Sequence, residues 1–291
     1  QIQWATGSSL LNWSNLPRNK KVLIKSHDPR GIWFGNRRYR GVLIVESKSN
    51  RLFAVNHLGI ERYLMSVVGA EMPKEWPKAA LKAQAVAART YALRTLGKKE
   101  TFDINSTEST QVYLGIESET ASTKKAVNST RSLVLRYRGE LISAVFHSSS
   151  GGQTEASGSV WKYQLPYLIS VRDYDQHSPK YRWRMAFSPL ELKRIFLEVG
   201  GVKYIRIIGK SKTGRILRAN VIGPKGKLVL SGKQLRRRMK LKSTRAKFFI
   251  LPYKKNSERS IKFSDQNYSK LTSLDNSNYL LVKGFGFGHG V

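Results

Sequence analysis

An alanine-rich stretch free of internal glycine and proline constrains the fold of this chain more than any other segment. Residues 78–96 read KAALKAQAVAARTYALRTL, and Pro77 stands directly before them. Alanine has the highest helix propensity, and proline is favoured at the first position of a helix. We therefore expect one long helix here. Its many small side chains favour close packing against a neighbouring element.

A second helix is predicted just upstream, over residues 59–71. Apolar residues recur there at helical spacing, and they are Ile60, Tyr63, Leu64, Val67 and Val68. Pro73 ends this helix, because the residue before a proline is pushed out of the helical region. Glu71 is therefore expected at the carboxyl end of the helix.

Short strands are predicted on both sides of these helices. Residues 21–56 alternate between apolar and polar types around turn signals, which indicates an antiparallel meander. Further elements are predicted as a helix near 119–130, a strand pair over 132–147, a helix from Pro189 with Ser188 as its cap, strands at 203–208, 215–222 and 227–230, a helix at 232–240, and strands at 246–251 and before the glycine loop 284–290. The predicted fold class is α+β, with mixed sheets of short strands and a helical segment that carries Glu71.

The positive charge of the chain is unevenly distributed. The 52 lysines and arginines exceed the 19 acidic residues by 33. Residues 61–130 hold 10 basic and 8 acidic residues, whereas residues 181–260 hold 23 and 3. Such an excess of positive charge indicates a polyanionic partner, such as nucleic acid, anionic lipid or a cell-wall polymer. The alternative is that the basic residues only form a solvated surface. We expect two lobes, one made of residues 1–180 with the returning 276–291, and an inserted basic α+β subdomain at 181–260.

Composition excludes several classes of protein. The chain has no cysteine, which removes disulfides, cysteine-ligated zinc and thiol nucleophiles. Hydrophobic residues make up 40% of the chain, enough for a packed core. No run approaches the roughly 18 apolar residues that a membrane span requires. The sequence starts at Gln1 instead of Met, which is compatible with removal of an N-terminal signal or anchor.

Glu71 is the acidic residue with the most informative position. The negative end of a helix dipole disfavours its charged form, and partial burial against Trp76 would act in the same direction. Both effects raise the pKa of the carboxyl toward the range of a general acid. The alternative is an ordinary surface glutamate at a helix end.

Two glycine-rich loops carry the other candidate groups. His147 ends an apolar strand and opens the run SSSGG, where hydroxyls and backbone N–H groups suit recognition of sugar hydroxyls or an acetamido group. The alternative is a structural histidine in a turn. The second loop, GFGFGHG, is a tight turn that could bring His289 close to a ligand. Its glycine spacing is not that of a dinucleotide-binding loop. The serine loop lacks the G-x-S-x-G pattern of hydrolases, and the five histidines are too scattered to suggest a metal site.

Five segments, in this order, resemble the stage II sporulation protein D family, which includes the amidase enhancers. They are EMPKEWPKAALKAQAVAARTYAL (71–93), STQVYLG (109–115), FHSSSGGQTE (146–155), SGKQLR (231–236) and GFGFGHGV (284–291). Family members continue beyond the GHG loop with a G-M-S-Q-x-G-A type segment, whereas this sequence stops at Val291. We therefore expect the chain to be incomplete at its C-terminus.

The resemblance implies a peptidoglycan lytic transglycosylase, which cleaves MurNAc-GlcNAc glycan strands and leaves 1,6-anhydroMurNAc ends. The family's catalytic glutamate, in its E-M-P motif, corresponds to Glu71. One glutamate suffices for this chemistry, because the 6-hydroxyl of the sugar replaces the second carboxylate or water of a hydrolase. Some members hold zinc through Cys and His in the segment matching 103–111, which here reads DINSTESTQ, so neither a metal nor another cofactor is expected.

The resemblance and the residue types together indicate the substrate-binding groups. Gln111 and the 147–150 loop match positions that line the family's cleft, and Tyr91 and Tyr113, like Trp76, suit stacking against sugar rings. The candidate substrate-binding residues are Gln84, Arg89, Tyr91, Gln111, Tyr113, His147, Ser149, Ser150 and His289.

Two other functions stay open at this point. A non-catalytic cell-wall-binding amidase enhancer would carry the same Glu71, and its partner would be an N-acetylmuramoyl-L-alanine amidase. A nucleic-acid-binding protein is suggested by charge alone, without a recognisable motif. The expected partner is peptidoglycan, with no specific nucleic acid and no membrane span, so the expected location is the cell envelope.

Overall fold

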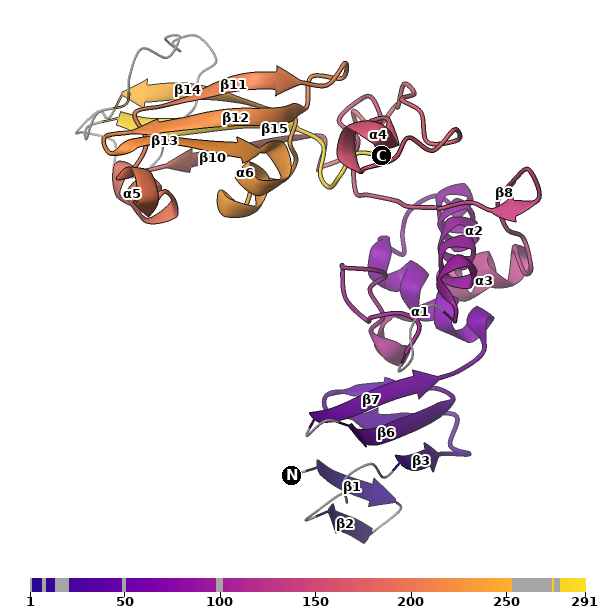
Figure 1. Cartoon of the computed structure of the whole chain (residues 1–291). Coiled ribbons are helices and arrows are strands. Elements are labelled where there is room, and N and C mark those ends of the chain that lie inside the picture. The colour runs from indigo at the N-terminus through magenta and orange to yellow at the C-terminus, as the bar shows by residue number, and fades with distance from the viewer. Residues whose placement is uncertain are drawn as a thin grey trace. The chain divides into compact units, whose positions relative to one another are not determined.

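A computed structural model describes residues 2–6, 9–13, 21–48, 51–97, 102–252, 274 and 278–291 (Figure 1). Its contacts divide the chain into two compact units, residues 1–145 and 146–291. The described residues form short antiparallel sheets and six α-helices, which confirms the predicted α+β class.

The first unit begins with antiparallel strands, and those within residues 21–57 form the predicted meander. Its strands are β1 (Ile2–Thr6), β2 (Ser9–Trp13), β3 (Lys21–Lys25), β4 (Ile32–Phe34), β5 (Arg37–Tyr39), β6 (Val42–Lys48) and β7 (Arg51–His57). β3, β6 and β7 form one sheet with β6 in the centre, while β4 pairs with β5 in a hairpin. Leu43 and Val45 of β6 are buried with Ile32, as alternation along a half-buried strand requires.

Three helices form the rest of the first unit, and both helices predicted around Pro73 and Pro77 are confirmed. They are α1 (Ile60–Glu71), α2 (Lys78–Thr95) and α3 (Ala121–Ser129), which contact one another. Ala85, Ala88 and Ala92 of α2 are fully buried, so the small side chains do allow close packing. The hairpin of β8 (Arg136–Tyr137) and β9 (Glu140–Leu141) follows, shorter than the predicted strand pair.

The segment between α2 and α3 lies directly against α1. It ends in a 3-10 turn, η1 (Gly115–Ser118), and a Cβ on Gly69 of α1 would lie only 1.9 Å from the carbonyl oxygen of Ser118. Only glycine permits this approach. The hydroxyls of Ser66 and Ser118 are 2.8 Å apart, and Ser66 Oγ accepts a hydrogen bond from the Leu114 N–H at 3.2 Å. These contacts hold the segment across the carboxyl-terminal half of α1.

The second unit contains two three-stranded sheets with short helices. Its elements are α4 (Ser157–Val160), β10 (Arg182–Phe187), α5 (Pro189–Ile195), η2 (Leu197–Val199), β11 (Tyr204–Lys210), β12 (Ile216–Gly223), β13 (Gly226–Ser231), α6 (Gly232–Arg238), β14 (Ala246–Pro252) and β15 (Asn278–Phe285). The strand orders are β11-β12-β13 and β10-β15-β14. Ser188 caps α5, as the sequence predicts, and the structure adds a capping box with Glu191.

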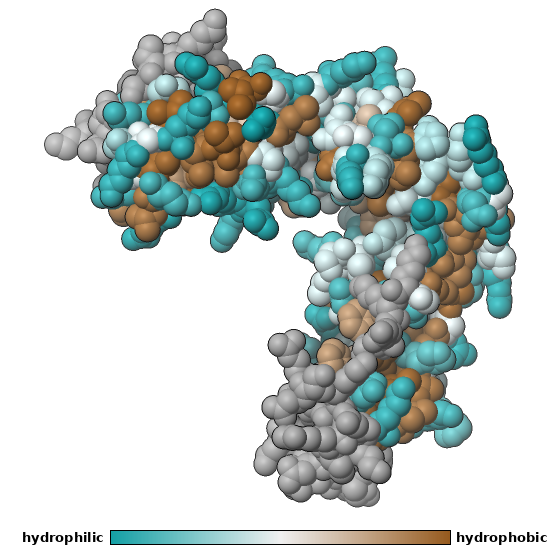
Figure 2. Space-filling model, in the orientation of Figure 1, coloured by the Kyte–Doolittle hydropathy of each residue, from teal (hydrophilic) through white to brown (hydrophobic). Residues whose placement is uncertain are grey.

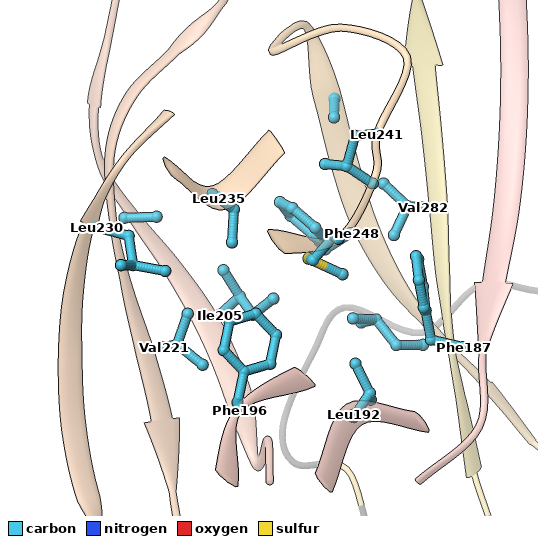
Figure 3. Packing of buried hydrophobic residues seen from close by; sticks show 14 of the residues in the cluster. Phe187, Leu192, Phe196, Ile205, Val221, Leu230, Leu235, Leu241, Phe248 and Val282 are labelled. Carbon is cyan, nitrogen blue, oxygen red and sulfur yellow. The ribbon is translucent and has the colours of Figure 1, made fainter. Parts of the chain in front are cut away.

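One hydrophobic core lies between the two sheets of the second unit (Figure 3). Val221 and Leu230 point into it from one sheet, Phe248 and Val282 from the other, and Leu235 from α6. Hydrophilic side chains lie between apolar ones on the outer surface of this unit (Figure 2). Apart from the buried Arg215, the cations in the described part of this region, residues 181–252, are exposed or half-buried around a regular core.

The bounds of the two units differ from those of the two expected lobes. The contacts separate residues 145 and 146, not residues near 180. β15, which was expected to return to the first lobe, lies between β10 and β14, where Arg182 pairs with Phe285 and Ala246 with Gly284. The backbone of β15 needs partners on both sides, and strands of the basic region supply them.

Candidate functional site

Glu71 is the last residue of α1, at the point where Met72 leaves helical geometry. Its Oε1 accepts a hydrogen bond from the backbone N–H of Val112 at 2.8 Å, from the segment that lies against α1. The carboxyl is therefore held at a fixed place by two elements far apart in sequence.

Burial raises the pKa of Glu71 above its ordinary value, and the nearby charge of Glu108 acts in the same direction. The N–H of Val112 opposes them, because it stabilises the charged carboxylate. The direction is the one expected from the sequence. Trp76, the expected packing partner of Glu71, is 38% exposed.

Three tyrosine rings lie close together at the segment beside Glu71. The rings of Tyr63 and Tyr113 are 5.2 Å apart, and Tyr39 lies 5.9 Å from Tyr113. Tyr63 donates a hydrogen bond to Oε1 of Gln111 at 3.0 Å, and Tyr113 donates to Oδ1 of Asn56 at 2.6 Å. Burial raises the pKa of both phenols, so they stay protonated and act as donors at neutral pH.

Several predicted substrate-binding residues of the first unit are buried. Gln111 has no exposed surface, and its Nε2 donates to the carbonyl of Ala88 at 3.1 Å. Tyr113 is 7% exposed. The polar groups of Gln111 and Tyr113 are bonded to other protein groups close to the segment that holds Glu71.

Arg89 is buried, and its hydrogen bonds go to other protein groups. It is 1% exposed, and its guanidinium donates to Glu61 of α1 and to the carbonyls of Val127 and Leu133. The predicted direct contact of Arg89 with substrate does not fit this placement, because its donor groups face protein acceptors.

Gln84 and Tyr91 of α2 are half-buried. The Nε2 of Gln84 is buried without a hydrogen-bond partner among the described residues, and such a group has an unfilled donor. Burial raises the pKa of the Tyr91 phenol. Of the residues predicted in this unit to bind substrate, these two have the most suitable exposure.

The two predicted histidines of the second unit lie together. The rings of His147 and His289 are 5.2 Å apart, and Trp161 lies 5.2 Å from His289. His147 Nδ1 is 3.0 Å from the carbonyl oxygen of Val291, and His289 Nδ1 accepts from the N–H of Val291 at 3.0 Å. Burial lowers the pKa of both rings, to about 4 for His289, so both are neutral at pH 7.

Ser149 and Ser150 are buried, and both hydroxyls are bonded to protein groups. Ser149 Oγ donates to Asp175, and Ser150 Oγ accepts from the N–H of Gly152. Burial would raise the pKa of Asp175, but the Ser149 hydroxyl and the N–H groups of Gly151 and Gly152 lower it overall. Asp175 was not predicted as a site residue, because DYDQHSPK carries no spacing that distinguishes it from a surface acid.

Sequence reasoning also missed Tyr63, Asn56 and Glu108. Tyr63 was recognised only as part of an apolar helix face, since the pattern does not show where a phenol points. No group of three His, Asp or Glu residues in the described ranges is placed to hold a metal ion. Among the helices of those ranges, none combines the length and apolarity needed to cross a bilayer.

Comparison with known proteins shows to which family the chain belongs. The family described as Stage II sporulation protein matches residues 48–137, the segment that contains Glu71, Val112 and Tyr63. The amidase enhancer of Bacillus subtilis (strain 168) is 32% identical over 270 residues, which cover 78% of this chain and 36% of that protein. The chain belongs to the stage II sporulation protein D and amidase enhancer family.

Other relatives agree with this family assignment. The stage II sporulation protein D of B. subtilis is 29% identical over 257 residues, covering 82% of this chain and 67% of that protein. An uncharacterized protein of Brachyspira hyodysenteriae is 38% identical over 157 residues, 53% of this chain and 43% of that protein. The chain therefore spans about a third of the length of the amidase enhancer and less than half of that of the Brachyspira protein.

Proposed function

We propose that the chain acts on the bacterial cell wall as a peptidoglycan lytic transglycosylase, with Glu71 as its single acid/base. The observation that carries this proposal is a carboxyl of raised pKa, held on one oxygen by the N–H of Val112. Membership of a family with sporulation and amidase-enhancer proteins supports a role at the cell wall and a location in the cell envelope.

The chemistry needs two proton transfers, one from Glu71 and one back to it. Protonated Glu71 donates its proton to the glycosidic oxygen as the bond from C1 of MurNAc breaks. The resulting carboxylate stabilises the positive charge at C1 and accepts the proton of the 6-hydroxyl as that oxygen attacks C1. The products are a 1,6-anhydroMurNAc end and a free GlcNAc 4-hydroxyl, and Glu71 regains its proton.

The second unit supplies a surface suited to an anionic glycan. Two aromatic rings of the glycine loop each lie beside two cations. Lys180 Nζ and Lys242 Nζ are 5.3 and 5.4 Å from the ring of Phe287. Arg182 and Arg245 lie 5.7 and 5.4 Å from the ring of Phe285. Rings that stack on sugars and cations that pair with lactyl carboxylates would together bind such a strand.

The deciding experiment compares Glu71→Gln with the unchanged protein on glycan strands stripped of stem peptides. Glutamine keeps the hydrogen bond from Val112 but has no proton to transfer, so cleavage should fall by at least about 10²- to 10⁴-fold. Mass spectrometry of the unchanged enzyme's products should show ends one water lighter than hydrolysed ends. Glu75→Gln is the matched control, because Glu75 is exposed and lies in the turn directly after α1.

A second candidate function rests on the name of one relative, the amidase enhancer of B. subtilis. In this case the full-length protein would bind wall and accelerate an N-acetylmuramoyl-L-alanine amidase without cutting glycan. Absence of anhydro ends together with amidase stimulation that survives Glu71→Gln would favour it. Reducing ends would instead indicate a hydrolase with a second carboxylate.

A further inference from the structure

We propose that Gln111 is a positioning residue for Glu71 and does not bind substrate. Its buried carboxamide joins α1 to α2 and thereby holds the N–H of Val112 on one oxygen of the Glu71 carboxyl. The inference rests on the proposed function, since it states how the acid/base of that function is oriented.

The carboxamide of Gln111 is bonded to both helices. Oε1 accepts from the hydroxyl of Tyr63 in α1 at 3.0 Å, and Nε2 donates to the carbonyl of Ala88 in α2 at 3.1 Å. The residue has no exposed surface. A buried amide with both ends bonded is fixed in orientation, because breaking either bond leaves an unpaired polar group.

This fixed side chain determines where the next peptide lies. The N–H of Val112 donates to Oε1 of Glu71 at 2.8 Å. Further along, Leu114 N–H bonds to Ser66 Oγ at 3.2 Å and the Tyr113 hydroxyl to Asn56 at 2.6 Å. The segment is thus anchored after Val112 by Ser66 and Asn56. Before Val112, Gln111 bonds it to both helices, and Asp103 accepts a hydrogen bond from the N–H of Gly97 at 2.7 Å.

The bond from Val112 has a directional consequence for catalysis. Oε1 accepts the N–H and is therefore the oxygen without the proton when Glu71 is in its acid form. The transferable proton lies on Oε2. Losing the N–H would leave both oxygens free to carry the proton, and fewer molecules would have it aimed at the glycosidic bond.

The charged and titratable groups facing Glu71 define the expected pH effect. Tyr63 of α1 is neutral, and Glu108 of the inter-helix segment raises the pKa of Glu71. Lys74 and Glu75, in the turn after α1, are exposed and paired with each other at 3.8 Å. Only the Val112 N–H lowers the pKa of Glu71, so its displacement would raise that pKa further.

Two variants and one control test the assignment. Gln111→Met keeps the length of the side chain without its hydrogen bonds. Tyr63→Phe removes only the hydroxyl that donates a hydrogen bond to Gln111. Thr110→Val is the control, because it deletes a hydrogen bond to the Asn105 carbonyl within the same segment but no link to α1 or α2. We expect kcat to fall about 10- to 100-fold in Gln111→Met and less in Tyr63→Phe, with KM nearly unchanged.

The pKa of Glu71 is the decisive readout, and it does not require turnover. Carboxyl ¹³C signals of glutamate-labelled protein, assigned with Glu71→Gln, should titrate at higher pH in both variants and at the wild-type pH in Thr110→Val. The alkaline limb of the kcat profile should move in the same direction.

An unchanged pKa in folded Tyr63→Phe and Gln111→Met would overturn the proposal, and a rise in KM alone would return Gln111 to the substrate site. If Gln111→Met does not fold, Tyr63→Phe decides. If the wild type cleaves no glycan, the proposed function fails while the titration still tests the positioning role.

Discussion

Glu61 and Arg89 form a two-point ion pair inside the first unit. The Nε of Arg89 is 2.9 Å from Oε1 of Glu61, and its Nη2 is 2.7 Å from Oε2. The arginine is 1% exposed, and the same guanidinium reaches the carbonyl of Val127 at the end of α3. One side chain of α2 thus links all three helices that place Glu71.

Replacing Arg89 by methionine should destabilise the protein strongly. The change leaves the Glu61 carboxylate without its partner, and breaking a mostly buried pair from one side costs about 3–5 kcal/mol. Urea denaturation measures the loss. Arg62→Met, at an exposed position of α1, is the control and should change stability by less than about 0.5 kcal/mol. Equal effects of the two substitutions would contradict the structural role of Arg89.

Glu71→Gln should make the protein more stable at neutral pH. Burial raises the folded pKa of Glu71 above its ordinary value, so folding favours the protonated form. Stability from such a group is complete below the unfolded pKa and is lost as pH rises through the folded pKa. Glutamine avoids this loss. The gain should appear in denaturant midpoints at pH 7 and vanish near pH 4. A variant less stable than wild type at pH 7 would refute this.

The histidine pair should make the second unit sensitive to acid. The pKa of His289 is lowered from 6.5 to about 4, chiefly by burial, so the unfolded chain binds a proton more readily than the folded one. Stability from His289 is therefore complete above about pH 6.5 and lost as pH falls toward 4. His289→Gln should flatten the stability profile in this window, which denaturation at pH 7, 6 and 5 can measure. A profile as steep as that of the wild type would mean that other groups cause the loss.

Binding to purified sacculi should depend on where the cations lie as well as on total charge. Replacing Lys180, Arg182 and Lys242 by glutamate should weaken retention at low salt, because these cations surround Phe285 and Phe287. The control changes the same number of charges in exposed lysines on other elements of the unit, namely Lys210, Lys227 and Lys233. Retention of both variants should decline with salt, since screening acts over about 8 Å at physiological ionic strength. If both sets of substitutions weaken retention equally, total charge explains the binding and the position of the cations does not.

The helices and strands were largely predictable because their signals are local. Pro73, Pro77 and the alanine-rich run determine α1 and α2, and Ser188 followed by Pro189 marks the start of α5. The position of Glu71 at the end of α1 follows from the same signals.

The surroundings of Glu71 were not predictable, because they come from contacts distant in sequence. Nothing local shows that Gln111 turns inward to Tyr63 and Ala88, or that Arg89 pairs with Glu61. A polar residue in a motif has the same sequence appearance whether it faces substrate or supports another residue. Its burial separates the two cases.

The central place of β15 has a consequence for biosynthesis. Chains are made from the N-terminus, so β10 and β14 leave the ribosome before residues 278–285, the strand that pairs with both. Until then each of these strands lacks the neighbour that joins them, and their apolar side chains, Phe187 and Phe248 among them, lack one wall of their core. The sheet of the nascent second unit therefore keeps unpaired strand edges, which can pair with other chains, until β15 has been synthesised.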